Sequence, residues 1–118
     1  MDSAPTGKRR SNRHQCSLPV ELRPVGQAYP TQSETSDISE FGCYVKTLFP
    51  WPAGTAIGMR IAFNGTEILA KGVVKTADQG VGNGIEFVEF IADGKHQLHE
   101  YLASLGDPDP EPSSTVIP

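Results

Sequence analysis

Residues 55–76, TAIGMRIAFNGTEILAKGVVKT, decide the fold. Their first half alternates large apolar residues with small or polar ones, and the apolar set is Ile57, Met59, Ile61 and Phe63. This period of two predicts a strand over 55–63 with one buried face. Asn64-Gly65 then supplies the two positive-φ residues of a type I′ turn. The return strand, 67–76, places Ile68, Ala70 and Val74 on one face and Glu67, Lys71 and Lys75 on the other. The segment therefore predicts a β-hairpin.

Four further strands and one helix are expected around this hairpin. The strands are residues 18–22, 27–33, 43–47 and 82–90, the last with Ile85 and Phe87 as core residues. Segment 27–33 is polar and is placed at a sheet edge, because Pro30 cannot donate to a ladder. Asp93 is a candidate N-cap for a helix whose apolar residues recur at helical spacing, namely Leu98, Tyr101, Leu102 and Leu105. Gly106 and Pro108 end it. The pattern predicts an all-β fold, a six-stranded antiparallel β-barrel with a C-terminal α-helix.

The size of the chain indicates one domain. It has 118 residues, 37% of them hydrophobic, and its 12 glycines and 10 prolines indicate many turns. We expect a flexible N-terminal arm over 1–7, a barrel domain over 8–106 that includes the basic segment and the helix, and a disordered tail over 107–118. No apolar run approaches the ~20 residues of a membrane helix, and the first residues do not resemble a secretory signal. A cytoplasmic domain without membrane insertion is expected.

Charge is distributed unevenly along the chain. Residues 1–23 hold five Lys and Arg against two acids, a balance of +3, whereas the other 95 residues hold five bases against twelve acids, a balance of −7. A nucleic-acid-binding domain needs a broad basic face, which this composition argues against. A basic arm on an acidic body fits one compact anionic ligand instead.

The sequence gives little sign of catalysis or of a metal site. Cys16 and Cys43 lie 27 positions apart without a CxxC motif, so we predict two reduced, half-buried thiols. His96 and His99 are expected on the solvent side of the helix. Glu86 and Glu89 are three residues apart, which in a regular strand places them on opposite faces, so they do not form an acid/base pair. We predict no enzyme activity, no metal and no cofactor.

Two polar segments interrupt the β pattern. Before the first strand stand Arg9, Arg10 and Arg13, preceded by Lys8; a guanidinium forms a planar donor fork that fits phosphate or the O6/N7 edge of guanine. The second segment, SDISEFG at 36–42, enters a later strand. Its Asp37 can accept from the N–H edge of a base, its Ser39 can donate, and its Gly42 allows close approach of a ligand to the backbone. Taken singly, each segment is also typical of a solvated tail or of a turn.

Together the two segments resemble the signature of the PilZ family, RxxxR followed by Asp-x-Ser-x-x-Gly, with 23 residues between Arg13 and Asp37. The resemblance extends over residues 8–105 and includes Pro19-Val20, the GlyCysTyrVal after the second motif and GlyIleGluPhe in the last strand. PilZ domains are six-stranded antiparallel barrels that bind the bacterial second messenger cyclic di-GMP. The resemblance implies that Arg9 and Arg13 hold guanine and phosphate, that Arg10 reaches a phosphate, and that Asp37, Ser39 and Gly42 hold the second guanine and its phosphate. Lys8 is an additional candidate phosphate contact.

A non-enzymatic sensor is therefore expected, in which cyclic di-GMP orders the arginine arm onto the barrel and changes the surface offered to a protein effector. The family often binds this ligand as a stacked pair, and the four basic residues of the arm favour a pair. The alternative is a protein–protein adaptor with a PilZ-like barrel that does not use nucleotide. The loop Phe49-Pro50-Trp51-Pro52 is either an effector surface or a cover over the barrel mouth, and the cover is favoured.

Overall fold

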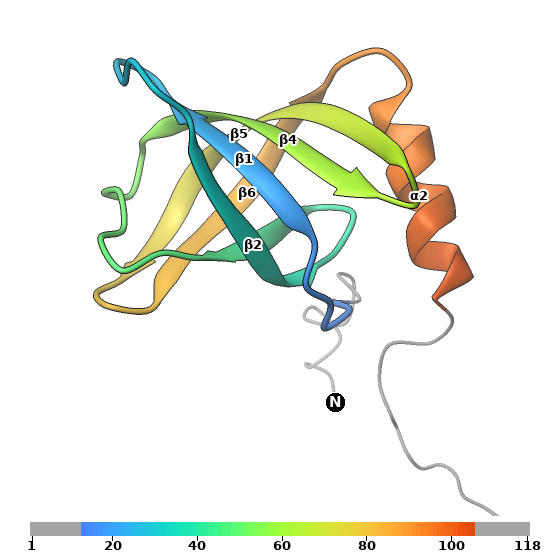
Figure 1. Cartoon of the computed structure of the whole chain (residues 1–118), viewed down its shortest axis with the longest axis horizontal. Helices are drawn as coiled ribbons and strands as arrows, with labels where there is room; N and C mark the ends of the chain where they lie inside the picture. Colours follow the sequence, from blue (N-terminus) through green and yellow to red (C-terminus); the bar gives the residue numbers. More distant parts are fainter. Residues whose placement is uncertain (1–12, 106–118) are drawn as a thin grey trace, which may run out of the picture.

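Six antiparallel strands close into a barrel, and one helix covers one end of it (Figure 1). The computed structural model describes residues 13–105. The elements are β1 Pro19–Pro24, β2 Thr31–Ile38, β3 Gly42–Lys46, β4 Ala56–Phe63, β5 Thr66–Asp78, β6 Gly82–Phe90 and α2 Gly94–Ser104. Around the barrel the strands follow the order β1-β2-β3-β6-β5-β4. The predicted barrel with a C-terminal helix is confirmed. The predictions for the N-terminal arm and for the tail from residue 107 lie outside the described residues.

The hairpin that decides the fold is formed by β4 and β5, as predicted. All four apolar side chains of β4 are at most 8% exposed, and Ile68, Ala70 and Val74 of β5 are buried with them. Asn64 and Gly65 connect the strands with φ values of 49° and 73°, the positive pair that a type I′ turn requires. The long β5 continues to Asp78 and also pairs with β6, so the hairpin connects both halves of the barrel.

The prediction for the second strand was wrong in position and in type. Residues 25–30 connect β1 to β2, and β2 runs from Thr31 to Ile38. It is not an edge strand, since it pairs with both β1 and β3. The inward residue Thr35 is fully buried and stabilised by hydrogen bonds: its Oγ1 accepts from the Leu18 N–H at 2.9 Å and donates to the Cys16 carbonyl at 2.7 Å. Because the buried residue is a threonine and its neighbours are polar, the sequence of β2 does not show the alternation of apolar and polar residues that identifies a strand.

Two bulges change which side chains share a face. In β2, Thr35 pairs with Val45 and Asp37 with Tyr44, so Ser36 is the extra residue. In β6, Phe87 pairs with Gly72 and Glu89 with Lys71, so Val88 is extra. The second bulge contradicts the prediction that Glu86 and Glu89 lie on opposite faces. Both are exposed and face lysines of β5, Glu86 beside Lys75 at 3.4 Å and Glu89 beside Lys71 at 3.8 Å.

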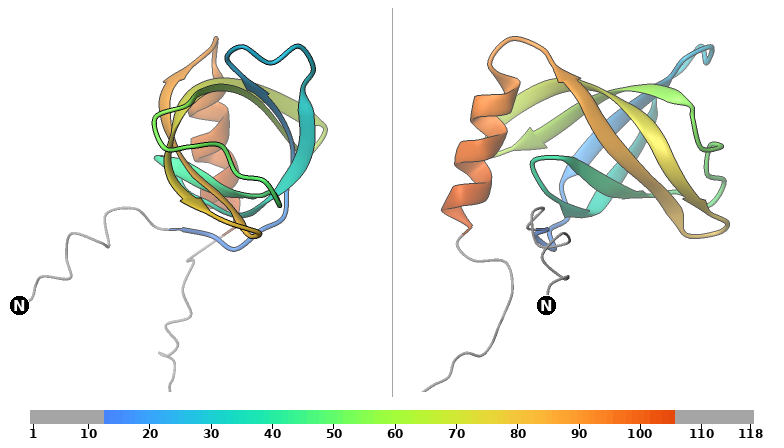
Figure 2. Two further views of the ribbon diagram at one scale, coloured as in Figure 1. Left: turned by 90° about the vertical axis from the view of Figure 1, so that its left-hand side faces the viewer. Right: turned by 180° about the vertical axis from the view of Figure 1, so that it is seen from behind.

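Helix α2 packs its apolar side onto the barrel end. Leu98 and Leu102 are buried, and the rings of Phe63 and Tyr101 stack with centroids 4.4 Å apart. In the left view of Figure 2 the helix is seen beyond the ring of strands. Asp93 occupies the N-cap position, as predicted, but makes no side-chain capping hydrogen bond. Leu105 is 40% exposed, so the prediction that it belongs to the buried apolar side of the helix was wrong. Gly106 lies outside the described residues. His96 and His99 are exposed, as predicted.

The predictions for the two cysteines and for the loop 49–52 are each confirmed in part. Both cysteines are free thiols, and Cys16 is half-buried, but Cys43 is completely buried rather than half-buried. Trp51 packs against the core, whereas Phe49 is 83% exposed, so the loop covers the barrel mouth with only one of its two aromatic residues. Across residues 13–105 no helix is long and apolar enough to cross a membrane, and no cluster of three or more His, Cys, Asp or Glu is placed to hold a metal ion.

Candidate ligand-binding site

A groove of about 440 Å³ lies on the outer face of β3, β6 and β5. It is lined by Arg13, Asp37, Phe41, Gly42, Tyr44, Lys75, Thr76, Gly84, Ile85 and Glu86. The topology explains this set, because β6 lies between β3 and β5 and brings together residues that are far apart in sequence. The second polar motif thus faces a wall contributed by the C-terminal half of the chain.

The two signature segments meet at one ion pair. The Arg13 Nε lies 2.8 Å from the Asp37 Oδ1, and the two side chains are 42% and 29% exposed. Two backbone hydrogen bonds hold the chain beside this pair: the His14 N–H donates to the Ile38 carbonyl at 2.8 Å, and the Ile38 N–H donates to the His14 carbonyl at 2.9 Å. These contacts place Arg13 against β2.

The Ser36 bulge gives Asp37 its outward direction. Thr35 and Ile38 are both buried, and without an extra residue between them Asp37 would not face the same side as Tyr44, its partner in β3. With the bulge, Asp37 and Tyr44 stand next to each other on the groove wall. One additional residue in β2 thus places a carboxylate beside Arg13.

Gly42 has a structural reason to be glycine. A Cβ built on it would lie 2.2 Å from the Ile85 carbonyl oxygen, so β3 and β6 approach each other here as only glycine permits. The predicted reason, approach of a ligand to the backbone, stays a prediction, and Gly42 does line the groove.

Ser39 does not line the groove. It is completely buried, and its hydroxyl accepts from the Phe41 N–H at 3.1 Å and lies 3.4 Å from the Gly42 carbonyl, to which it donates. The Ser39 N–H donates to the same carbonyl at 2.8 Å. In this structure Ser39 holds the turn between β2 and β3. Arg9, Arg10 and Lys8 lie outside the described residues, so of the predicted site the structure brings together Arg13, Asp37 and Gly42.

Sequence reasoning missed the far wall of the groove. The Tyr44 hydroxyl donates to Asp78 Oδ2 at 2.5 Å, and burial, followed by this hydrogen bond, raises the pKa of Tyr44 to about 12. Lys75 is the extra residue of a third bulge, in β5, and pairs with Glu86. The alternation of the sequence already placed Lys75 on the face of its strand opposite the apolar residues. What it lacked was the strand order that puts those faces side by side.

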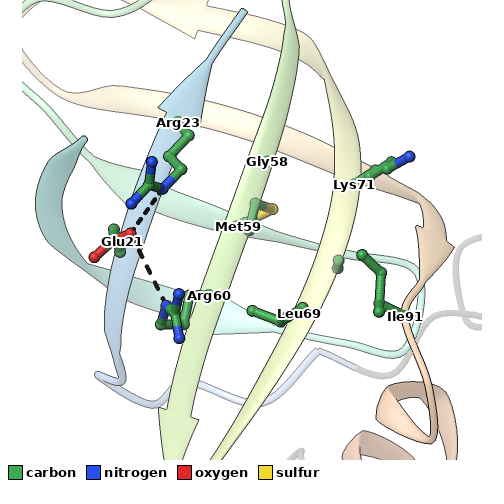
Figure 3. A pocket seen from close by; sticks show the side chains of 9 residues that line it. Glu21, Arg23, Gly58, Met59, Arg60, Leu69, Lys71 and Ile91 are labelled. Atoms are coloured by element: carbon green, nitrogen blue, oxygen red, sulfur yellow. Dashed lines mark hydrogen bonds and ion pairs between the residues drawn. The ribbon is translucent and has the colours of Figure 1, made fainter. Parts of the chain in front are cut away.

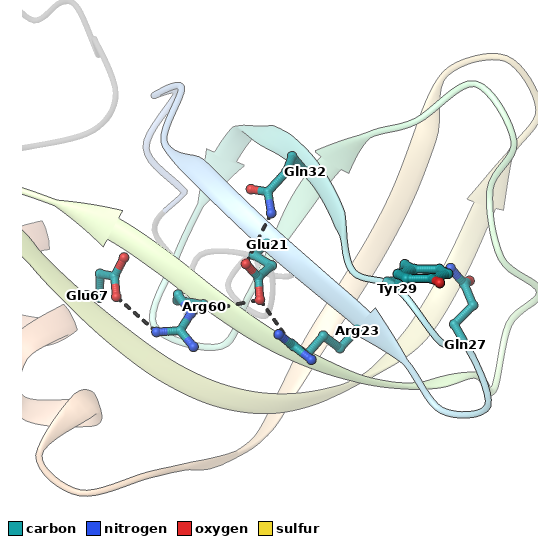
Figure 4. Close-up of polar contacts among 7 residues, drawn as sticks. All are labelled: Glu21, Arg23, Gln27, Tyr29, Gln32, Arg60 and Glu67. Carbon is teal, nitrogen blue, oxygen red and sulfur yellow. Dashed lines mark hydrogen bonds and ion pairs between the residues drawn. The ribbon is translucent and has the colours of Figure 1, made fainter.

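A second, smaller groove of about 250 Å³ lies over Gly58 on the outer face of β1, β4 and β5 (Figure 3). Its cations are already neutralised. Glu21 accepts hydrogen bonds from Gln32 and from Arg23, whose Nε is 2.9 Å away (Figure 4). Both hydrogen bonds lower the pKa of Glu21, and the one from Gln32 has the larger effect. Arg60 lies between Glu21 and Glu67, with its Nη1 3.0 Å from Glu67. Because Arg13 and Lys75 of the first groove are also paired with carboxylates, this pairing does not separate the two grooves. The second groove differs in that none of its lining residues belongs to the two signature segments.

The fold and the first groove together define a small β-barrel with a groove on its outer surface, beside the segment that leads into the first strand. The family model for the PilZ domain matches residues 7–104. The chain belongs to the PilZ domain family.

Solved structures agree with this fold. The chain is similar to the Bacillus subtilis inhibitor of motility MotI/DgrA, with a TM-score of 0.68 and 18% identity over 82% of this chain, and it spans only 50% of the length of that protein. It is also similar to the PilZ domain of CeSA from a cellulose-synthesizing bacterium, with a TM-score of 0.61 and 22% identity over 79% of this chain and 96% of that one. No curated protein matches the chain.

Proposed function

We propose that this chain is a non-enzymatic sensor that binds cyclic di-GMP in the groove beside β3. The observation that carries the proposal is the contact between Arg13 and Asp37, because it brings the two halves of the PilZ signature to one place on the barrel. Membership of the family adds the ligand: PilZ domains generally bind cyclic di-GMP.

The chemistry of the groove matches the groups of this ligand. Cyclic di-GMP presents two phosphates and two guanines. The Arg13 guanidinium provides a donor fork for phosphate or for the O6/N7 edge of guanine, and Asp37 accepts from a guanine N–H edge. Lys75 adds a cation, and the Tyr44 ring adds an aromatic face on the same wall. Glycines at 42 and 84 leave the wall without side chains at two points.

The basic residues before the described part complete the proposed site. Arg9, Arg10 and Lys8 are assigned to phosphate and guanine on the strength of the family motif. In the sequence these three residues precede Arg13 by only a few positions, and the neighbouring His14 is hydrogen-bonded to Ile38. The ligand then orders the arm against the barrel, and the altered surface is read by a protein effector. Four basic residues in the arm favour a stacked pair of ligands.

Isothermal titration with cyclic di-GMP tests the proposal. Arg13→Ala and Asp37→Ala should each weaken binding roughly tenfold to hundredfold, the value of one good bidentate contact. Arg23→Ala is the matched control, since Arg23 is an exposed arginine on the opposite side of the barrel and also pairs with a carboxylate. It should bind as the unaltered chain does.

The same titration separates the sensor from the adaptor that does not use nucleotide. Absence of heat at high ligand concentration, together with unchanged amide NMR shifts, would favour the adaptor. A stoichiometry of two ligands per chain would support the stacked pair, and a stoichiometry of one would exclude it.

A further inference from the structure

The end of the barrel opposite α2 exposes a set of apolar side chains. They belong to three connections, 25–30, 47–55 and 79–81, which we call the loop rim (Figure 1). Its exposed large residues are 58–83% accessible and comprise Val25, Tyr29, Leu48, Phe49 and Val81. The left view of Figure 2 looks onto this end. None of these side chains belongs to the hydrophobic core, which is formed by inward residues of the strands together with Leu18, Leu98 and Leu102.

The loop rim is free of charge. Its eighteen residues include no Lys, Arg, Asp, Glu or His, although 20% of the whole chain is charged. It holds three of the chain's nine aromatic residues, Tyr29, Phe49 and Trp51. Depletion of charge and enrichment of aromatic residues are the compositional marks of the centre of a protein–protein interface.

Hydrogen bonds join the three connections into one unit. The buried Asn83 side chain accepts from the Trp51 N–H at 3.0 Å and donates to the Trp51 carbonyl at 2.9 Å, and the Trp51 Nε1 donates to Gln27 at 2.9 Å. The Gly80 N–H donates to the Leu48 carbonyl at 3.2 Å. Phe49 and Leu48 are therefore presented from a fixed loop, which lowers the entropy that association has to overcome.

From these observations we infer that the loop rim is the contact surface of a homodimer, with two copies of this chain meeting rim to rim. Each copy is acidic, with a formal charge of −4, so the electrostatic repulsion between two copies is smallest when they meet through faces without charged side chains. A two-fold axis brings the same patch of both copies together. Eighteen residues per copy also come close to the roughly 20–30 per side of a standard interface.

The surroundings of the rim favour a protein copy over a lipid surface. Loops that insert into anionic membranes are accompanied by unpaired Lys and Arg. The cations of the adjoining strand ends, Arg23 and Lys46, lie 2.9 Å and 3.9 Å from Glu21 and Glu34. Residues 13–105 together carry seven Lys and Arg against ten Asp and Glu. An anionic headgroup layer would thus meet a net negative protein.

Sedimentation velocity and light scattering on the full chain, without nucleotide, test this inference. Between low micromolar and high micromolar concentration, the mass should rise from 12.7 kDa toward twice that value. The double variant Leu48→Ser/Phe49→Ser should weaken association at least tenfold and keep the circular dichroism of the unaltered chain. Val88→Ser is the matched control, because Val88 is 66% exposed, like Leu48 at 68%, but lies on β6 away from the rim. Its mass should follow that of the unaltered chain.

Three results would overturn the homodimer. The first is a chain that stays monomeric at every concentration. The second is a Val88→Ser variant that weakens association as strongly as the double variant does. The third is a dimer that weakens as salt rises, because screening weakens ion pairs and leaves apolar contacts intact. If the chain is a monomer that sediments with phosphatidylcholine vesicles, and the double variant does not sediment with them, the loop rim is a lipid-binding surface instead. The inference is independent of cyclic di-GMP, so neither proposal depends on the other.

Discussion

At the scale of single residues, two glycines of the barrel strands are expected to respond oppositely to the same substitution. Gly42→Ala forces a methyl group into the Ile85 carbonyl, 2.2 Å away, and should destabilise the fold by about 1–3 kcal/mol or more through overpacking. Gly58→Ala meets nothing closer than 3.8 Å and should stabilise β4 by about 0.5–1 kcal/mol, because glycine carries an entropy cost in a strand. Urea denaturation of both variants gives the comparison. Equal effects of the two substitutions would contradict this account of Gly42.

The second prediction at this scale concerns the thiols. Burial raises the pKa of Cys43 to about 12 from an ordinary value of 9.0, and it also raises the pKa of the half-buried Cys16. A folded-state pKa above the unfolded value means that the contribution of Cys43 is complete below pH 9 and is lost as the pH rises toward 12. Tyr44 acts in the same direction, with its pKa raised from 10.0 to about 12. The free energy of unfolding should therefore fall with pH above pH 9, and less steeply in Cys43→Ala.

Thiol labelling checks the same burial at neutral pH. In the folded chain a disulfide reagent should modify Cys16 slowly and Cys43 only on unfolding, because the thiolate is the reactive form and Cys43 has no access to solvent. Cys16→Ser leaves Cys43 as the one thiol and isolates its rate. Rapid labelling of that folded variant would show that β3 opens locally.

At the scale of elements, Thr35 connects β2 to the segment that leads to Arg13. Its hydroxyl serves both the Leu18 N–H and the Cys16 carbonyl inside the barrel wall. Thr35→Val keeps the shape and leaves both groups without this partner, which should cost about 1–3 kcal/mol. Because the segment also carries Arg13, ligand affinity should fall as well, without any change in a groove residue. Thr35→Ser keeps the hydroxyl and is the control. Calorimetric unfolding and the titration with cyclic di-GMP measure the two effects.

Local sequence patterns predicted the elements that alternate cleanly, and failed where a bulge or a polar interior residue interrupts the alternation. The β4–β5 hairpin was predictable because the nine residues from Ile57 to Gly65 specify both the buried face of the strand and the turn. The predicted position of β2 was wrong because a polar residue, Thr35, occupies the core position at which an apolar residue is expected. The bulge at Val88 shifts the alternation of β6, so Glu89 lies on the same face as Glu86 and not on the opposite face.

The site was predictable as a motif but not as a surface. The spacing of the arginines and of Asp37 identified the family, and the contact of Arg13 with Asp37 fits that reading. Tyr44, Lys75 and Glu86 were missed because their proximity depends on β6 lying between β3 and β5, a long-range pairing that local patterns do not encode. The role of Ser39 inside its turn likewise depends on Gly42 being three residues ahead in a particular bend.

At the scale of the whole molecule, α2 closes the core, so the barrel and helix should unfold together. Two leucines of this region make the test. Leu98 is 1% exposed and Leu105 is 40% exposed. Leu98→Ala should cost about 2–5 kcal/mol and lower the temperature of a single transition, whereas Leu105→Ala should change stability by less than about 1 kcal/mol. Two separate transitions in Leu98→Ala would show that the helix is a detachable cover.

The described chain enters and leaves the barrel on the side of α2, away from the loop rim (Figures 1 and 2). Fluorescent proteins or whole additional domains can consequently be joined by linkers before Lys8, which keeps the arginine segment next to the barrel in the sequence, or after Leu105, with the opposite end of the barrel left open. Such fusions turn one polypeptide into a reporter: energy transfer between two differently labelled copies would follow self-association inside living cells, with the nucleotide level as an independent variable.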